Sequence, residues 1–251
     1  MDAIQLFDVQ AGLGGARPGQ RQPVTAAELG CWLDRLEISR AVVRLAPDDL
    51  DCDVPRSNEL LFAAAREDTR FAPCPTILPA AAGDVPREDV QVAMFVAGGA
   101  AAVCIRPAKD GWSLSPWCSG RLFTALAERR VPTLCLERYV TLEDVARLAE
   151  RHPGLPFVVA GVGYRSLRTL LPLLQTCENV YLSAGSNFAV YRGIELLASR
   201  VGPQRLLFGT GFPEAMPAMA VSQLMYAELS DNDKALIGGG NLTRLMMRIA
   251  R

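Results

Sequence analysis

Short apolar runs rich in β-branched residues alternate with amphipathic segments along the whole of this 251-residue chain. The runs are continuously apolar, which is typical of strands buried on both faces in a parallel sheet covered by helices. Eight strand–helix units average about 31 residues each, the spacing of a (β/α)8 TIM barrel. We therefore predict an α/β barrel as a single domain over residues 1–251, with a C-terminal helical extension. The predicted strands are Ile4–Val9, Arg40–Leu45, Phe71–Leu78, Ala100–Arg106, Val131–Leu136, Pro156–Ala160, Asn179–Ser183 and Arg205–Gly209.

Helix signals between these strands support the same architecture. Thr25 is followed three residues later by Glu28, and Thr141 by Asp144, and each pair has the spacing of a capping box. An open doubly wound sheet is the main alternative fold. The glycine-rich segment 12–17 has Arg17 where the dinucleotide fingerprint requires its third glycine, so the barrel is favoured.

Charge and composition exclude several classes of protein. The 26 basic residues, 24 of them Arg, balance 27 acidic residues and form no cluster, which argues against a nucleic-acid partner. The longest uncharged stretch, Val90–Ile105, is shorter than the roughly 20 residues of a membrane span. Seven Cys without a CxxC pair indicate neither a zinc ribbon nor a disulfide framework, so we expect a cytoplasmic protein without a signal peptide.

Five motifs occur in order along this pattern. They are Phe7–Gly14, Gly99–Pro107, His152–Phe157, Arg205–Pro213 and Gly239–Leu245. Together they resemble the first, fourth, sixth and eighth strand regions and the closing Gly-Gly-Asn motif of the amidohydrolase-2 (decarboxylase-like) family. The resemblance covers nearly the whole chain and implies a TIM barrel with its site at the C-terminal mouth.

The resemblance also implies one divalent metal, often zinc, and this chain departs from the family at its ligands. The family's two strand-one His, strand-six His and strand-eight Asp correspond here to Gln10, Gly12, Gly161 and Gly211. A catalytic zinc site needs about three imidazole, carboxylate or thiolate donors. The single His of the chain, His152, precedes strand six on the opposite face of the barrel, where we expect it to stabilise a helix end. We therefore predict that the metal site has been lost and that no cofactor is bound.

Polar residues at the C-terminal ends of the predicted strands remain as site candidates. The catalytic candidates are Asp8 and Glu137 as general acid or base and Arg106 as oxyanion stabiliser. The ligand-binding candidates are Gln10, Arg44, Arg138, Tyr164, Arg165, Ser183, Thr210 and Glu214. Several Arg near one opening suit a carboxylate or phosphate, because guanidinium groups bind such anions bidentately. In the alternative interpretation, Asp8 and Glu137 pair with Arg106 and Arg138 as a buried ion network.

Three hypotheses about function follow. The first is a metal-free amidohydrolase-like barrel that binds a small anionic molecule without turnover, or that acts as a partner subunit. The second is a metal-independent hydrolase or lyase, and the third is a conventional metal-dependent hydrolase or decarboxylase. Whether the chain is an enzyme stays open at this point, and a homodimer or a hetero-partner is compatible with each hypothesis.

Overall fold

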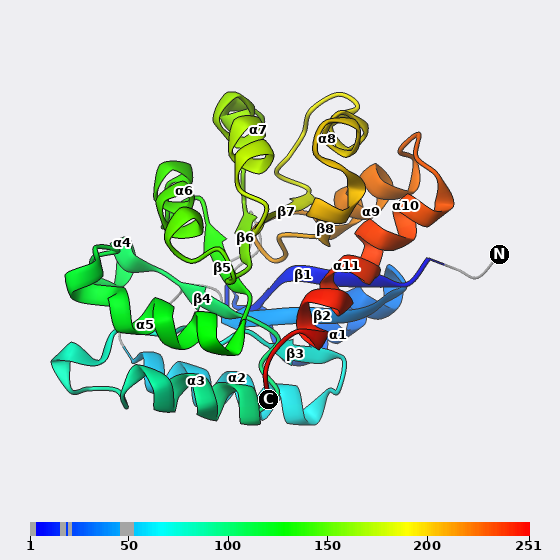
Figure 1. The fold of residues 1–251 in the computed structure, drawn as a ribbon. Coiled ribbons are helices and arrows are strands. Elements are labelled where there is room, and N and C mark those ends of the chain that lie inside the picture. Colours follow the sequence, from blue (N-terminus) through cyan, green and yellow to red (C-terminus); the bar gives the residue numbers. More distant parts are fainter. Residues whose placement is uncertain (1–3, 16–18, 20–21, 46–52) are drawn as a thin grey trace.

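Eight parallel strands with intervening helices form a (β/α)8 barrel in the computed structural model, which describes residues 4–15, 19, 22–45 and 53–251 (Figure 1). The strands are β1 (Leu6–Leu13), β2 (Ile38–Leu45), β3 (Phe71–Pro73), β4 (Val103–Ile105), β5 (Thr133–Leu136), β6 (Phe157–Ala160), β7 (Val180–Gly185) and β8 (Leu206–Gly209). They pair in parallel in the order β1-β2-β3 and β4-β5-β6-β7-β8.

The two runs of strands are joined into one closed ring by backbone hydrogen bonds. Between β3 and β4, the Ala101 N–H donates to the Pro73 carbonyl at 2.9 Å, and the Cys104 N–H donates to the Pro75 carbonyl at 2.8 Å. Between β8 and β1, the Gly211 N–H donates to the Gln10 carbonyl at 3.0 Å. Closure of the ring gathers the C-terminal ends of all eight strands at one mouth.

The helices lie around this ring, and the predicted N-cap residues Thr25 and Thr141 cap two of them. Thr25 Oγ1 accepts from the Glu28 N–H at 3.2 Å, and Thr141 Oγ1 accepts from the Asp144 N–H at 3.1 Å. The α-helices are α1 (Ala26–Arg35), α2 (Val54–Glu67), α3 (Glu88–Ala97), α4 (Pro107–Asp110), α5 (Pro116–Arg129), α6 (Leu142–Arg151), α7 (Leu167–Thr176), α8 (Gly193–Val201), α9 (Pro217–Met225), α10 (Asp231–Ala235) and α11 (Asn241–Met247). Among the helices of the described residues, none is long and apolar enough to cross a membrane.

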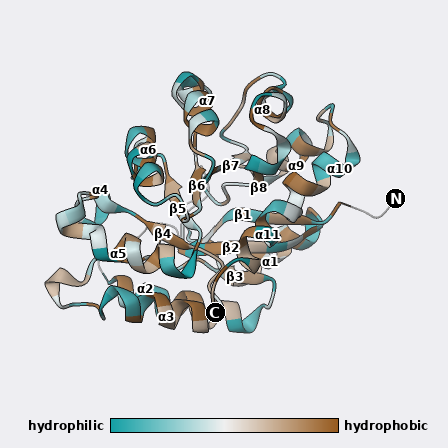
Figure 2. Ribbon diagram, viewed as in Figure 1, coloured by the Kyte–Doolittle hydropathy of each residue, from teal (hydrophilic) through white to brown (hydrophobic). Residues whose placement is uncertain are grey.

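Alternation along the strands divides the apolar residues between two cores. On β5, for example, Leu134 and Leu136 belong to the cluster inside the barrel, whereas Cys135 packs in the larger cluster between strands and helices. The brown, apolar strands in Figure 2 are therefore covered on both sides. This arrangement explains why the strands are continuously apolar in sequence.

All eight predicted strands are present, but several bounds differ. β1 continues to Leu13, four residues beyond the predicted end, and β7 continues to Gly185. The longer β1 places Gln10 and Gly12 within a strand that pairs with β2 as far as its last residue. Strand ends are set by tertiary pairing, which a local apolar pattern does not record.

The C-terminal region is helical as predicted and contains a π-helical turn, Leu236–Gly240, between α10 and α11. Gly239 lies against the first strand, because a Cβ there would be only 2.8 Å from the Gln5 carbonyl oxygen. The Asn241 side chain donates to the carbonyls of Pro203 and Leu206 at 2.8 and 2.9 Å. The final helices are thereby held beneath β8.

His152 ends α6, as expected of a structural residue on the face away from the mouth. Its N–H donates to the Leu148 carbonyl at 2.9 Å, and its ring stacks on Phe123 with centroids 5.6 Å apart. Burial, helped by the nearby Arg151 charge, lowers the pKa of His152 below its usual value. The imidazole is thus a neutral packing group.

Candidate functional site

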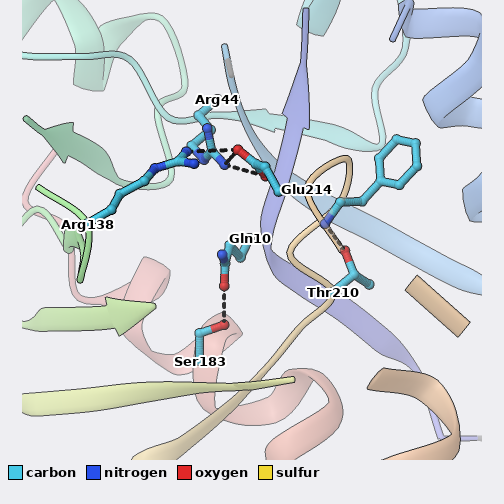
Figure 3. A network of polar contacts seen from close by, with 7 residues as sticks. Gln10, Arg44, Arg138, Ser183, Thr210 and Glu214 are labelled. Atoms are coloured by element: carbon cyan, nitrogen blue, oxygen red, sulfur yellow. Dashed lines mark hydrogen bonds and ion pairs between the residues drawn. The ribbon is translucent and has the colours of Figure 1, made fainter. Parts of the chain in front are cut away.

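Buried polar side chains from four strand regions meet at the mouth of the barrel (Figure 3). Gln10 lies on β1, Arg44 on β2, Ser183 on β7, and Thr210 directly after β8. Ser183 Oγ donates to Gln10 Oε1 at 3.0 Å, which links β7 to β1 across the barrel. These predicted site residues are therefore brought together by the fold.

An ion triad connects the interior of the mouth to solvent. Arg44 Nη2 donates to both carboxylate oxygens of Glu214 at 2.7 and 2.9 Å, and Arg138 Nη2 donates to Glu214 Oε1 at 2.8 Å (Figure 3). The side chains of Arg44, Glu214 and Arg138 are 3%, 29% and 41% exposed, so the triad runs outward from the barrel. Burial raises the pKa of Glu214, but attraction and hydrogen bonds from both Arg outweigh it and hold that pKa below its usual value.

Arg44 has hydrogen-bonding capacity that the protein does not use. Its Nε and Nη1 atoms are buried and have no hydrogen-bond partner in the described part of the chain. Burial disfavours the charge of Arg44, but Glu214 outweighs that effect, so its pKa is raised and the guanidinium stays charged. Two guanidinium groups facing one carboxylate give the triad an excess of one positive charge.

Tyr139 lies beside these arginines. Burial raises the pKa of Tyr139, and the charges of Arg138, Arg44 and Arg106 oppose that shift. The Arg138 guanidinium lies 4.9 Å from the centre of the Tyr139 ring. The charges of three arginines therefore act on Tyr139. Tyr139 itself was missed, although it follows two predicted site residues directly after β5.

Asp8 is a structural clasp between β1 and β8. Its carboxylate accepts from the Gln10 N–H at 2.8 Å, from the Thr210 N–H at 2.9 Å and from the Thr210 hydroxyl. The Thr210 hydroxyl in turn accepts from the Phe212 N–H at 3.1 Å. Burial raises the pKa of Asp8, and these hydrogen bonds oppose the shift without cancelling it.

The predicted ion network of Asp8 and Glu137 with Arg106 and Arg138 is wrong in its partners. Glu137 accepts from the Ser166 hydroxyl and from the Gly163 N–H, which ties the end of β5 to the loop after β6. Arg106 donates to both oxygens of Asp110 at 2.9 and 3.1 Å within α4. Neutral donors satisfy the two carboxylates, and Arg106 pairs with a carboxylate four residues further along the chain.

Tyr164 and Arg165 lie on the 3-10 helix Tyr164–Ser166 after β6. Arg165 Nε donates to the Tyr164 hydroxyl at 3.2 Å, and its guanidinium lies 5.7 Å from the centre of the Tyr164 ring. Tyr164 is 56% exposed. The structure pairs these two candidates with each other at the rim, outside the triad.

Side-chain amide nitrogens lie near Gly161 and Gly211, two of the positions that the motif resemblance aligns with metal ligands of the family. A Cβ on Gly211 would lie 3.6 Å from Gln10 Nε2 and 4.0 Å from Asn187 Nδ2, and a Cβ on Gly161 would lie 4.0 Å from the same Asn187 atom. Gly161 and Gly211 have φ angles of 74° and 71°, where any other residue is strained. In residues 4–15, 19, 22–45 and 53–251, no group of three or more His, Cys, Asp or Glu side chains is placed to hold a metal ion. Amide nitrogens are not ligands that a divalent cation prefers.

Asn187 was missed because β7 was predicted to end at Ser183. The strand ends at Gly185, so Asn187 follows its C-terminal end by two residues. A search four residues beyond each predicted strand end would have found it.

We expect the Arg44–Glu214 pair to stabilise the fold above about pH 4.5 and to lose this effect in acid. Because the folded-state pKa of Glu214 is lowered from 4.5, its contribution is present above that value and is lost as the pH falls through the folded-state pKa. The difference in melting temperature between wild type and Glu214→Gln should therefore shrink from pH 7 to pH 3. The control is Glu67→Gln, a change at an exposed residue. If the melting temperatures of wild type and Glu214→Gln differ as much at pH 3 as at pH 7, the stabilisation does not come from the charge of Glu214.

Comparison with known proteins gives structural relatives over the whole barrel. 5-Carboxyvanillate decarboxylase from Sphingomonas paucimobilis is 12% identical, with a TM-score of 0.76, and the match covers 99% of this chain and 100% of that one. An uncharacterised TIM-barrel protein from Bordetella bronchiseptica is 14% identical, with a TM-score of 0.77 and coverage of 99% and 100%. A dihydroxybenzoic acid decarboxylase from Polaromonas sp. JS666, solved with manganese and an inhibitor, is 14% identical, with a TM-score of 0.73 and coverage of 98% and 97%.

At these identities the likeness establishes the (β/α)8 fold and not the chemistry. A search of curated protein sequences found no match. The sequence model of the family described as amidohydrolase matches residues 33–246, which includes β2 to β8 and most of the helices. This chain therefore belongs to the amidohydrolase family (amidohydrolase-2).

Proposed function

We propose that this barrel binds a small anion at its mouth through Arg44, without a metal ion and without turnover. The observation that carries the proposal is the pair of unpartnered, buried donors Nε and Nη1 of Arg44. A buried donor without a partner costs about 1–3 kcal/mol, so an acceptor that reaches it is strongly favoured. The excess positive charge of the triad adds attraction for an anion.

The chemistry of the mouth supports a metal-free site. Gln10 Oε1 is engaged by Ser183, which leaves the amide nitrogen on the side of Gly211. Nitrogen donors at that place attract electron-rich oxygen and repel a cation. Two of the similar structures carry names of decarboxylases that act on carboxylic acids, which makes a carboxylate the first anion to test.

Access to Arg44 passes the outer members of the triad. The unpartnered Arg44 atoms are closed to solvent, whereas Glu214 and Arg138 are 29% and 41% exposed. A ligand carboxylate therefore enters past Arg138 and moves the Glu214 side chain out of its path, so that it reaches Arg44 Nε and Nη1.

A metal-independent hydrolase or lyase fits the geometry less well. Asp8 already accepts three hydrogen bonds from β1 and from Thr210, so a proton transfer there would break the clasp between two strands. Glu137 is hydrogen-bonded to the loop after β6, and Arg106 is bound to Asp110. All three side chains are thus engaged by neighbouring groups of the fold.

Native mass spectrometry on untagged protein purified without chelator tests the metal-free part of the proposal. We expect a mass without bound metal, and no change in melting temperature on addition of Zn²⁺ or Mn²⁺. One retained equivalent of either metal, or decarboxylation of an aromatic acid that depends on Mn²⁺, would overturn the proposal and indicate a conventional member of the family.

Calorimetric titration with acetate and benzoate tests the anion site. We expect Arg44→Met to weaken benzoate binding about 10- to 100-fold, because charge-assisted hydrogen bonds are lost. Arg44→Lys keeps the positive charge but lacks the forked donors of the guanidinium. Its affinity for benzoate should therefore lie between those of wild type and Arg44→Met. Arg168→Met, an exposed change on α7, is the control. Benzoate binding that survives Arg44→Met in a folded protein rules out this site.

A further inference from the structure

A groove between α2 and α3 forms a second candidate binding site, which is lined by other residues than those of the mouth. The groove has a volume of about 870 Å³. Both helices contribute one face at helical spacing, Asn58, Phe62 and Ala65 from α2, and Gln91 and Met94 from α3. β3 forms its floor, and the two helices lie next to each other at the lower edge of Figure 1.

The groove extends along the length of α2. Val54 lies at the start of α2 and Arg66 in its last turn, and both line the groove. These residues are separated by about 18 Å along the helix. Arg40, near the start of β2, and Arg251 also line it. Because a barrel helix runs antiparallel to its strands, Arg66 and Arg40 lie towards the same end of the barrel, opposite the mouth.

The middle of the groove is apolar and partly open to solvent. Phe62 and Phe95 pack with ring centroids 5.9 Å apart, and Met94 beside them is 57% exposed. Gly98 permits this arrangement, because a Cβ there would be 2.8 Å from the Phe62 ring. Apolar surface of this kind gains free energy when an apolar ligand covers it.

The basic end of the groove lacks acidic partners. Arg40, Arg66 and Arg251 form no ion pair with any residue of the described chain, and the Arg40 guanidinium lies 4.7 Å from the centre of the Phe7 ring. The acidic side chain that lines the groove, Glu59, is bound to Arg56 at 2.9 Å. Charge complementarity therefore calls for a negative group at this end and an apolar body beyond it.

We infer that the groove binds an elongated amphipathic anion, namely an aliphatic carboxylate of medium chain length. Its carboxylate lies among the three arginines, and its chain follows α2 past Phe62 and Met94 towards Val54. An extended chain of about a dozen carbons covers most of the roughly 18 Å between the two ends of this path.

Calorimetric titration with octanoate, dodecanoate and dodecyltrimethylammonium tests the inference on the full chain. We expect one equivalent of dodecanoate to bind, with affinity rising up to about fourfold for each methylene added after octanoate. Met94→Glu should weaken dodecanoate at least about tenfold, and Arg66→Glu about five- to tenfold, because each places a like charge beside the ligand. The matched controls are Met219→Glu on α9, where Met219 is 48% exposed, and Arg200→Glu in the last turn of α8.

Three results would overturn the inference. The first is equal affinity for dodecyltrimethylammonium and dodecanoate, which shows that the groove does not select for a negative charge. The second is dodecanoate affinity that falls with Arg44→Met and not with Met94→Glu, which places the ligand at the mouth. The third is a dimer in sedimentation analysis that Met94→Glu dissociates, which makes a second copy the occupant. Failure here leaves the anion site at Arg44 standing, since that site is tested with acetate and benzoate.

Discussion

Asp8→Ala is expected to lower the free energy of unfolding by about 4 kcal/mol, because it leaves buried donors without partners. The backbone N–H groups of Gln10 and Thr210 and the Thr210 hydroxyl all donate to this carboxylate, whose residue is 1% exposed. For a chain of this length the melting temperature should fall by about 8 to 16 °C. Thermal unfolding followed by circular dichroism measures the change.

Asp8→Asn is the matched control for the loss of charge. The Asn carbonyl can accept from the two backbone donors, and its amide can donate to the Thr210 hydroxyl oxygen. Because burial raises the pKa of Asp8, the charged form destabilises the fold as the pH rises above 3.8 through the folded-state pKa, and Asn removes this cost. We expect Asn to be nearly neutral at pH 7. An Asn variant as unstable as the Ala variant would show that the charge itself holds the strands.

Glu214→Gln is expected to destabilise the protein by about 3 kcal/mol or more, because it leaves the buried Arg44 without a counter-charge. Arg44 Nη2 would retain a neutral acceptor in place of two carboxylate contacts at 2.7 and 2.9 Å. The double variant Arg44→Met/Glu214→Gln removes both charges and should recover most of the lost stability. Urea unfolding of the two single variants and the double variant measures the coupling between the two residues.

Addition of an anion distinguishes the role of Arg44 in stability, as the partner of Glu214, from its proposed role in anion binding. If an external carboxylate can replace that of Glu214, benzoate should raise the melting temperature of Glu214→Gln more than that of wild type. Binding to the native state stabilises a protein in proportion to the logarithm of ligand concentration over Kd. An equal response of both proteins would mean that the ligand does not use the Glu214 position, and no response in either would contradict the anion site.

Local patterns in the sequence were sufficient for the barrel and for the place of its mouth. The apolar runs that became β2, β6 and β8 differ from the observed strands by at most two residues at one end. Gln10, Arg44 and Ser183 were identified from their position near strand ends, and the fold brings them together. These features depend on periodicity within a few residues, which the sequence records directly.

The partners of each charge depended on contacts that the sequence does not record. Glu214 was one of several candidates after β8, and the closed ring places it against Arg44, 170 residues away. Asp8 was expected to need an arginine, but the closeness of β8 supplies neutral donors from Thr210. Pairing across a barrel is decided by ring closure and strand register, since both determine which side chains face the same space.

The sequence by itself determined the architecture of this protein and its family. Only the tertiary structure decided that Arg44 carries two unpartnered donors, because whether a buried group is satisfied depends on atoms from every neighbouring strand. It likewise decided that α2 and α3 leave a groove with a basic end, since their separation results from packing around the barrel. Periodic patterns are local properties of a chain, whereas unsatisfied donors and cavities are properties of its packing.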